Sequence, residues 1–188
     1  MRIILASKSW TRAEALKELG LEFETIASNF DEKSIRDKDP ERLALKLSEE
    51  KSKAVNVKDA LIISGDLFVV FNNRVYEKPK TKEEAFEMIK SFSNNSLEIV
   101  TAIAIRYNGK LRSAVETFKV QFRELSDSEI WEYIDEFPVI HCAAGFEGQG
   151  LVRFSIDHKD PTFHGISKKN ILKLLNEFGV KYDKKNIK

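Results

Sequence analysis

The chain has little of several features that mark specialised classes of protein. It contains one cysteine, Cys142, so no disulfide can form within the chain, and a reducing compartment is indicated. No apolar run approaches the roughly 18 residues of a membrane-spanning helix. The apolar run near the start is too short for the core of a signal peptide. We therefore expect a cytoplasmic protein without a membrane partner.

Charge of one sign is not in excess either. The chain has 31 Lys and Arg residues and 30 Asp and Glu residues, which leaves a net charge of +1. Nucleic-acid-binding domains usually carry a basic excess, so no nucleic-acid partner is expected. The three histidines, His141, His158 and His164, lack the spacing of metal ligands. No P-loop, dinucleotide-binding fingerprint or GxSxG nucleophile motif occurs.

Repeats, low-complexity tracts and Gly/Ser-rich linkers are absent, so nothing marks a domain boundary. A chain of 188 residues with 42% hydrophobic residues can bury a core without disulfides or a structural metal. We expect residues 1–188 to form a single domain.

The order of hydrophobic patterns and turn signals predicts a mixed α/β fold. A buried strand over residues 2–6 leads into a helix that ends at Gly20, and a second strand is predicted over residues 22–27. Two long strands, 97–107 and 111–123, are joined by Asn108-Gly109, a strong hairpin signal. Four further helices are predicted to begin at a Pro or a capping residue: Pro40, Thr81, Ser126 and Ser167. We expect a curved mixed sheet with a long antiparallel hairpin, helices on both faces and a central cleft.

The first strand delivers Ser7, Ser9 and Arg12 to a helix N-terminus. Free backbone N–H groups and the helix dipole make such a junction an anion-binding site, and an Arg in the first turn can grip phosphate with two donors. The alternative is helix capping by Ser9, with Arg12 as a solvated surface charge.

Carboxylates offer a second group of candidates. Asp31 and Glu32 follow a predicted strand and are suited to holding Mg²⁺, or they form an ordinary acidic loop. Asp66 lies between the apolar runs 60–64 and 67–71, which are readable as one interrupted strand or as two. An ionised Asp in such surroundings must be paired, metal-bound or at an open edge, unless it occupies a turn after Gly65.

Two lysines complete the set of candidates. Lys53 lies beside the apolar stripe predicted for its helix, Leu43, Leu47 and Ala54, and we expect it to face inward. Lys78 precedes Pro79 at a strand end, which holds its backbone extended; the alternative is a solvent-facing Lys before a turn.

Taken together and in order, these pieces resemble the Maf family over nearly the whole chain. Seven segments carry the resemblance: Leu5–Arg12, Asp31-Glu32, Lys53-Ala54, Ile62–Asp66, Lys78-Pro79, Ile99–Thr101 and Val120–Ser126. The resemblance implies a homodimeric enzyme that hydrolyses nucleoside triphosphates at the α-phosphate, giving a monophosphate and pyrophosphate with a divalent metal, Mg²⁺ or Mn²⁺.

On this resemblance each candidate acquires a role. Asp66 is implied as the general base or the metal-linked activator of water, and Glu32 as a metal ligand with Asp31 and Asp66. The implied phosphate and nucleotide ligands are Ser7, Ser9, Arg12, Lys53, Lys78 and Gln149.

The resemblance also separates subgroups by substrate. The stretch from His141 to Phe146 is similar to that of the subgroup associated with 7-methyl-GTP, whereas Gln149 matches the dTTP/UTP type. Leu67 and Glu77 depart from the usual family residues, and so does the segment 165–167. A nucleotide-binding regulator of cell division is the alternative function, and it would not require Asp66 or Glu32.

Overall fold

The computed structural model describes residues 1–183, which gather into two compact units. Unit 1 comprises Met1–Leu67, Thr101–Glu116 and the described residues from Phe163 onward, and unit 2 comprises Phe68–Val100 and Thr117–Thr162. Three long strands pass from one unit into the other: β3 (Ala60–Phe71), β5 (Ser96–Tyr107) and β6 (Lys110–Gln121). The division therefore falls within strands, and not in a linker.

One sheet contains all six strands, in the order β2-β1-β3-β5-β6, with β4 paired to β3. The shorter strands are β1 (Arg2–Leu5), β2 (Glu24–Thr25) and β4 (Arg74–Tyr76). β1 runs parallel to β2 and β3, with Ile4 opposite Ile62, whereas β4 runs antiparallel to β3. The prediction of a mixed sheet is confirmed.

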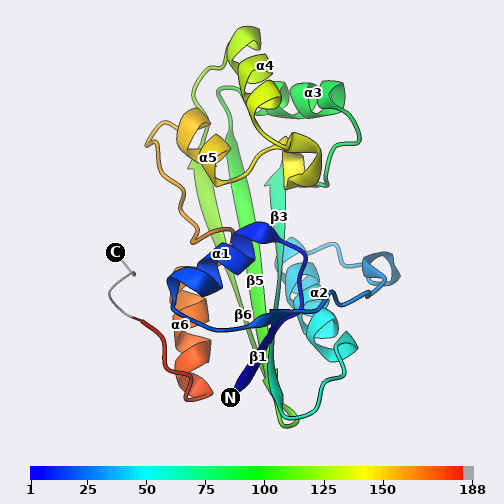
Figure 1. The fold of residues 1–188 in the computed structure, drawn as a ribbon. Coiled ribbons are helices and arrows are strands. Elements are labelled where there is room, and N and C mark those ends of the chain that lie inside the picture. Colours follow the sequence, from blue (N-terminus) through cyan, green and yellow to red (C-terminus); the bar gives the residue numbers. More distant parts are fainter. Residues whose placement is uncertain (184–188) are drawn as a thin grey trace. The chain divides into compact units, whose positions relative to one another are not determined.

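Unit 1 buries both faces of its part of the sheet, because alternate residues of a strand point to opposite faces. Ile3 and Leu5 of β1 pack with helices α1 (Trp10–Glu18) and α6 (Lys168–Glu177). Ile4 and Ala6 face the other way, toward Val55 at the end of α2 (Pro40–Ala54). Figure 1 shows α1 and α6 on one side of these strands and α2 on the other, so the prediction of helices on both faces is confirmed.

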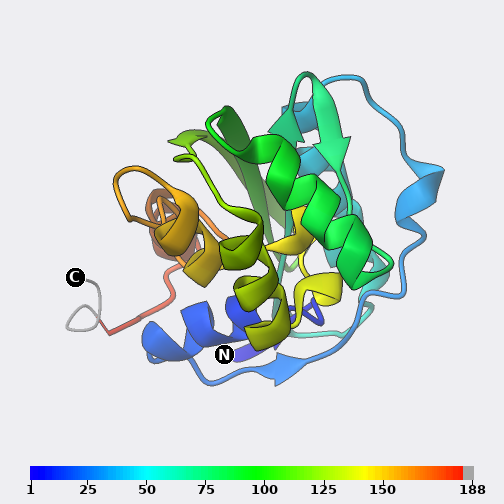
Figure 2. The same cartoon turned by 90° about the horizontal axis from the view of Figure 1, so that it is seen from above.

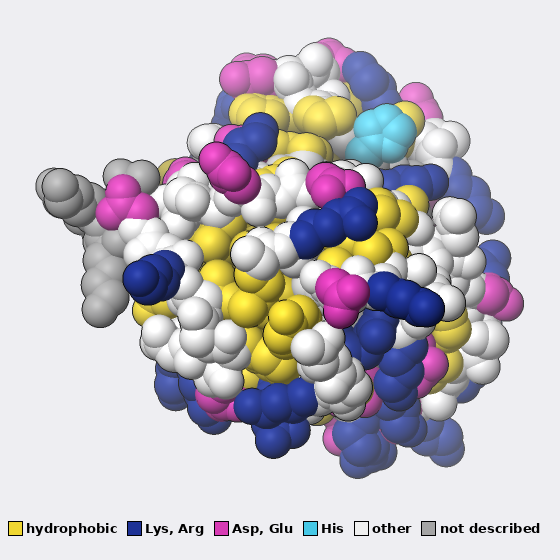
Figure 3. Space-filling view, turned by 60° about the horizontal axis from the view of Figure 1, so that its bottom comes forward, with side chains coloured by type: hydrophobic (Ala, Val, Ile, Leu, Met, Phe, Trp, Pro, Cys, Tyr) yellow, Lys and Arg dark blue, Asp and Glu magenta, His cyan; other side chains and the backbone are white. Residues whose placement is uncertain are grey.

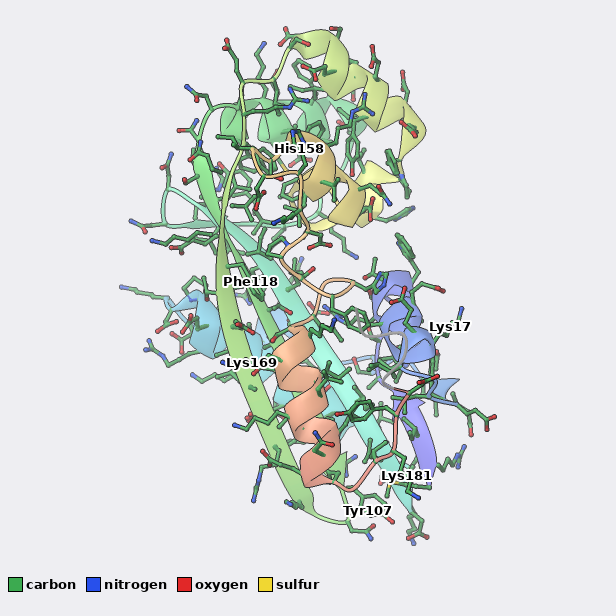
Figure 4. The ribbon with its side chains drawn as sticks, turned by 90° about the vertical axis from the view of Figure 1, so that its left-hand side faces the viewer. Lys17, Tyr107, Phe118, His158, Lys169 and Lys181 are labelled. Atoms are coloured by element: carbon green, nitrogen blue, oxygen red, sulfur yellow. The ribbon has the colours of Figure 1, made fainter. Side chains whose placement is uncertain are left out.

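Helix α6 packs against the β5–β6 hairpin within unit 1. Figure 4 shows α6 lying along the long strands, with Lys169 at one end of the helix and Tyr107 beyond the other. Arg112 Nε lies 3.6 Å from Glu177 Oε2, which ties the last turn of α6 to β6. The hairpin turns at Asn108 and Gly109, whose φ angles are 46° and 77°, as the sequence predicts.

Unit 2 contains α3 (Lys82–Phe92), α4 (Asp127–Glu136) and α5 (Gly148–Phe154), and α3 and α4 lie side by side in Figure 2. Two short 3₁₀ segments, Val139–His141 and Ala143–Gly145, precede α5. The core is rich in aromatic rings that pack around the fully buried Phe92: Phe71, Tyr76, Phe122 and Phe146.

The predicted capping residues begin their helices. Thr81 accepts a hydrogen bond from the Glu84 backbone, Ser167 caps α6, and Ser126 forms a reciprocal capping box with Glu129. The predicted strand 22–27 is wrong in length, because only Glu24 and Thr25 pair with β1.

The surface is mixed in charge, and acidic side chains lie among the basic ones on the face that Figure 3 shows. In the part of the chain from residue 1 to 183, no helix is both long and apolar enough to cross a bilayer.

Candidate active site

The junction between β1 and α1 is built by hydroxyl side chains. Ser9 caps α1: its Oγ accepts from the Arg12 backbone N at 3.4 Å and lies 2.7 Å from Thr11 Oγ1. The Ser9 backbone N donates to Ser7 Oγ at 3.1 Å. The first turn of α1 contains no acidic residue, so no carboxylate of that turn offsets the positive end of the helix dipole.

Arg12 is not the solvated surface charge of the alternative interpretation. Its Nη1 donates to Ser7 Oγ at 3.0 Å, and its Nε is buried without a hydrogen-bond partner within residues 1–183. Burial lowers the pKa of Arg12, and the negative charges of Asp66 and Glu32 oppose that shift. A half-buried guanidinium whose buried Nε lacks an acceptor is suited to an anionic ligand.

Gly65 makes room for Arg12. A Cβ built on Gly65 would lie 3.2 Å from Arg12 Nε and 2.8 Å from the Ala102 carbonyl oxygen of β5. Glycine is required here by space, since any side chain would push against a neighbouring strand and the guanidinium together.

Asp66 lies within one uninterrupted strand, β3, which excludes the interpretation as a turn residue. It is only 7% exposed. Its Oδ2 lies 3.1 Å from Lys51 Nζ, and its Oδ1 accepts from the Leu67 backbone N at 2.9 Å. The buried carboxylate is therefore paired, as the hydrophobic surroundings demanded.

Lys51 is the residue that the sequence interpretation missed. Its ammonium bridges two carboxylates, with Glu32 Oε1 at 3.0 Å and Asp66 Oδ2 at 3.1 Å, and its side chain is 9% exposed. The prediction that Lys53 faces inward is wrong: Lys53 is exposed and pairs with Glu50 on the surface of the same helix at 2.6 Å.

The apolar stripe predicted for α2, Leu43, Leu47 and Ala54, is not the face that the fold buries. Ala54 is exposed and Leu43 is only half-buried. The buried face instead consists of Ala44, Leu47, Ser48, Lys51 and Ser52. These residues follow the i, i+3, i+4, i+7, i+8 spacing of one helix face, but three of the five are polar. Lys51 was missed because the hydrophobic pattern used to find the inner face of this helix does not mark a face that is mostly polar.

The two neighbouring carboxylates of the loop differ in what they do. Asp31 caps a short 3₁₀ helix, η1 (Glu32–Ser34), by accepting from the Lys33 backbone N at 3.0 Å. Glu32 extends to Lys51, although its side chain is 56% exposed. Within the described residues 1–183, no group of three or more His, Cys, Asp or Glu side chains is placed to hold a metal ion.

Unit 1 thus brings four charged side chains from four elements into one cluster: Arg12, Glu32, Lys51 and Asp66. Two positive and two negative charges balance. A cluster of this kind can accept a polyanion at Arg12 while keeping a carboxylate close to it.

Lys78 and Gln149 belong to unit 2, and both are exposed. Lys78 follows β4, and its positive charge lowers the pKa of Cys142. Burial outweighs that effect and raises the pKa of Cys142 to about 11, so the thiol stays protonated near neutral pH. The Gln149 backbone N donates to Glu147 Oε1 at 3.0 Å at the start of α5.

A family model described as Maf-like protein matches residues 2–178. The chain belongs to the Maf family. The 7-methyl-GTP pyrophosphatase of Vibrio vulnificus is 32% identical over 187 residues, which cover 95% of this chain and 96% of that protein. The protein of the same name from Nitrosococcus oceani is 34% identical, and the match covers 83% of this chain and 80% of the relative.

The dTTP/UTP pyrophosphatase of Thermosipho africanus is 37% identical over 80% of this Maf chain and 78% of its own length. Among solved structures, the Ham1 protein of Staphylococcus aureus is 15% identical, with a TM-score of 0.46 over 95% of this chain and 97% of that one. Two kinds of relative, named for different bases, thus match one Maf chain.

Proposed function

We propose that this Maf protein is a nucleoside triphosphate pyrophosphatase, which hydrolyses its substrate at the α-phosphate to a monophosphate and pyrophosphate. The observation that carries the proposal is the cluster of buried Asp66 and Lys51 with half-buried Arg12 beside a helix N-terminus, in a chain whose relatives are named pyrophosphatases. The cluster combines a site for anions with a candidate base, which the reaction needs.

Arg12 and the junction before α1 bind the triphosphate. The Arg12 Nε has no protein acceptor within residues 1–183, and a phosphate oxygen would supply one. Ser7 orients the guanidinium through Nη1, and Ser9 holds the first turn of the helix. Positive charge at this point stabilises the charge that develops on the phosphoryl oxygens in the transition state.

Asp66 accepts the proton of the attacking water. As the water oxygen bonds to the α-phosphorus, the bond from that phosphorus to the bridging oxygen breaks and pyrophosphate leaves. Asp66 Oδ1 accepts from the Leu67 backbone N and Oδ2 contacts Lys51, so the carboxylate that takes the proton is held in a fixed orientation. Lys51 contacts Oδ2 and offsets the negative charge of the buried carboxylate.

Glu32 and Asp66 are the residues that would hold a divalent cation. Lys51 Nζ lies where Glu32 Oε1 and Asp66 Oδ2 converge, so the ammonium supplies the positive charge at that point. Mg²⁺ is commonly bound by one or two carboxylates together with waters and substrate phosphates. When bound, the metal would polarise a phosphoryl oxygen and lower the pKa of a water. Asp31 caps η1 and would support Glu32 through the backbone.

The proposal also includes four finer features. They are a nucleotide contact of Lys78, a nucleotide contact of Gln149, a homodimer and a cytoplasmic location. The identity of the base is also open to direct test, because relatives of both the 7-methyl-GTP and the dTTP/UTP type match the chain.

The test is product identification with purified protein and a panel of 7-methyl-GTP, GTP, dTTP and UTP, with Mg²⁺ or Mn²⁺ and with a chelator. We expect monophosphate and pyrophosphate, and loss of turnover when the metal is removed. Asp66→Asn should reduce kcat by about 10²–10⁴-fold, the usual worth of a positioned base. Release of orthophosphate, or wild-type turnover in a folded Asp66→Asn variant, would contradict the proposal.

A regulator that binds nucleotides without hydrolysing them is the other outcome of the same experiment. It predicts saturable nucleotide binding, measurable by calorimetry, with no product from any member of the panel. Arg12→Ala would then weaken binding, whereas Asp66→Asn would leave it intact.

A further inference from the structure

Trp10 is an unusual residue to find on the surface of this molecule. It is the first residue of α1, between Ser9 and Thr11, and is 54% exposed. Among the Phe, Tyr and Trp side chains of residues 1–183, only one other is exposed, Trp131 at 36%. A large ring that is exposed to water does not gain the free energy of burial, so a role for Trp10 other than core packing is expected.

Neither helix capping nor packing against other aromatic rings explains why a Trp occupies position 10. The capping hydrogen bond at the start of α1 is accepted by Ser9 Oγ, which also bonds to Thr11 Oγ1, and neither bond needs a particular side chain at position 10. Trp131 stacks on Phe86 with ring centroids 4.8 Å apart. No comparable ring contact joins Trp10 to an aromatic side chain in the part of the chain that the structure describes.

The place of Trp10 in the helix directs its ring. The Cα–Cβ bonds of a helix tilt toward its N-terminus, so the side chain of the first residue leans past the end of the helix. The same end presents the free N–H groups of α1 and the Ser7–Arg12 pair that are proposed to bind phosphates. The ring therefore lies at the same end of α1 as the proposed phosphate site.

We propose that Trp10 forms a stacking platform for the base of the bound nucleotide, and that this platform favours purines. The inference rests on the proposed function, since it places phosphates at the adjoining helix end. Every base has a flat face that stacks on an indole, and a bicyclic purine covers more of it than a pyrimidine does. A base that covers the exposed ring removes its apolar surface from water.

The experiment compares Trp10→Ala and Trp10→Tyr with the wild type. We expect Trp10→Ala to raise KM for GTP about tenfold, because stacking on one aromatic ring is typically worth about that factor. The rise should be smaller for UTP, and Trp10→Tyr should restore most of the affinity. Inorganic tripolyphosphate has no base, so its inhibition constant should stay the same in all three proteins.

Other results would overturn the inference. An unchanged KM for GTP in Trp10→Ala would mean that the ring does not touch the base. An equal loss of affinity for GTP and tripolyphosphate would mean that Trp10 supports the phosphate site. Thermal unfolding of each variant separates either result from simple misfolding.

Fluorescence gives a readout that does not depend on turnover. Trp131→Phe leaves Trp10 as the only indole, because the chain has two Trp residues. Titration with GTP should quench its emission, and tripolyphosphate should not. Quenching without hydrolysis would support the stacking role and refute the pyrophosphatase proposal. Hydrolysis without quenching would support the pyrophosphatase proposal and refute the stacking role.

Discussion

A single ammonium group, that of Lys51, holds two carboxylates in the cluster of unit 1. Its Nζ lies within 3.1 Å of Asp66 Oδ2 and 3.0 Å of Glu32 Oε1. Both members of the Lys51–Asp66 pair are almost completely buried. Removal of one partner from a buried pair leaves an uncompensated charge, which is more damaging than the loss of an exposed pair.

Lys51→Met and Lys53→Met test this distinction, because both remove one positive charge from the same helix. Lys51→Met should lower the free energy of unfolding by about 3 kcal/mol and strongly reduce turnover. Lys53→Met should change stability by less than about 1 kcal/mol, since its pair with Glu50 is exposed. Urea unfolding and turnover assays measure both; equal effects of the two substitutions would contradict the assignment of Lys51 to the site.

Residue chemistry explains which site residues were predictable. Asp66 was identifiable because a carboxylate inside an apolar run requires a partner. Its partner was not, since the polar face of α2 that carries Lys51 is buried by the fold and lacks a hydrophobic signature. Asp31 and Glu32 look alike in sequence, and only the structure distinguishes the cap from the ligand of Lys51.

At the scale of elements, strands β3 and β5 and helix α1 meet around Gly65. A methyl group at this position would lie 2.8 Å from a backbone oxygen of β5, which cannot move without shifting the strand. Gly65→Ala should therefore destabilise the protein by about 1–3 kcal/mol, the usual range for overpacking, and should raise KM by displacing Arg12. Chemical unfolding and steady-state kinetics measure the two effects.

Gly179→Ala is the matched control. Gly179 has a φ of 68° with no atom near its Cβ position, so alanine there meets backbone strain without a collision. We expect a stability loss of about 1–2 kcal/mol with unchanged KM. A Gly65→Ala protein that keeps the wild-type KM would show that Arg12 does not depend on this close approach.

Elements with strong local signals were predictable from sequence. The capped helices α3, α4 and α6 and the Asn108-Gly109 hairpin depend on neighbouring residues, which the sequence displays directly. Helix α5 was not predicted, because its sequence GQGLVRF begins with two glycines in three residues, which disfavour a helix. The length of β2 depends on pairing with β1, and no local pattern sets it.

At the scale of the whole molecule, the strands β3, β5 and β6 connect the two compact units. The family match over residues 2–178 spans both units, so the similarity to Maf proteins is not confined to the charged cluster. The order of motifs along the chain was visible in the sequence, whereas the division into units reflects contacts between distant segments and was not.

The central claim is that water attacks the α-phosphate, and hydrolysis in water labelled with heavy oxygen tests it most directly. Attack at the α-phosphorus and attack at the β-phosphorus both release monophosphate and pyrophosphate, but they place the label in different products. Mass spectrometry of both products after a single turnover should find the label in the monophosphate alone. Label in the pyrophosphate, with none in the monophosphate, would contradict the reaction proposed for Asp66.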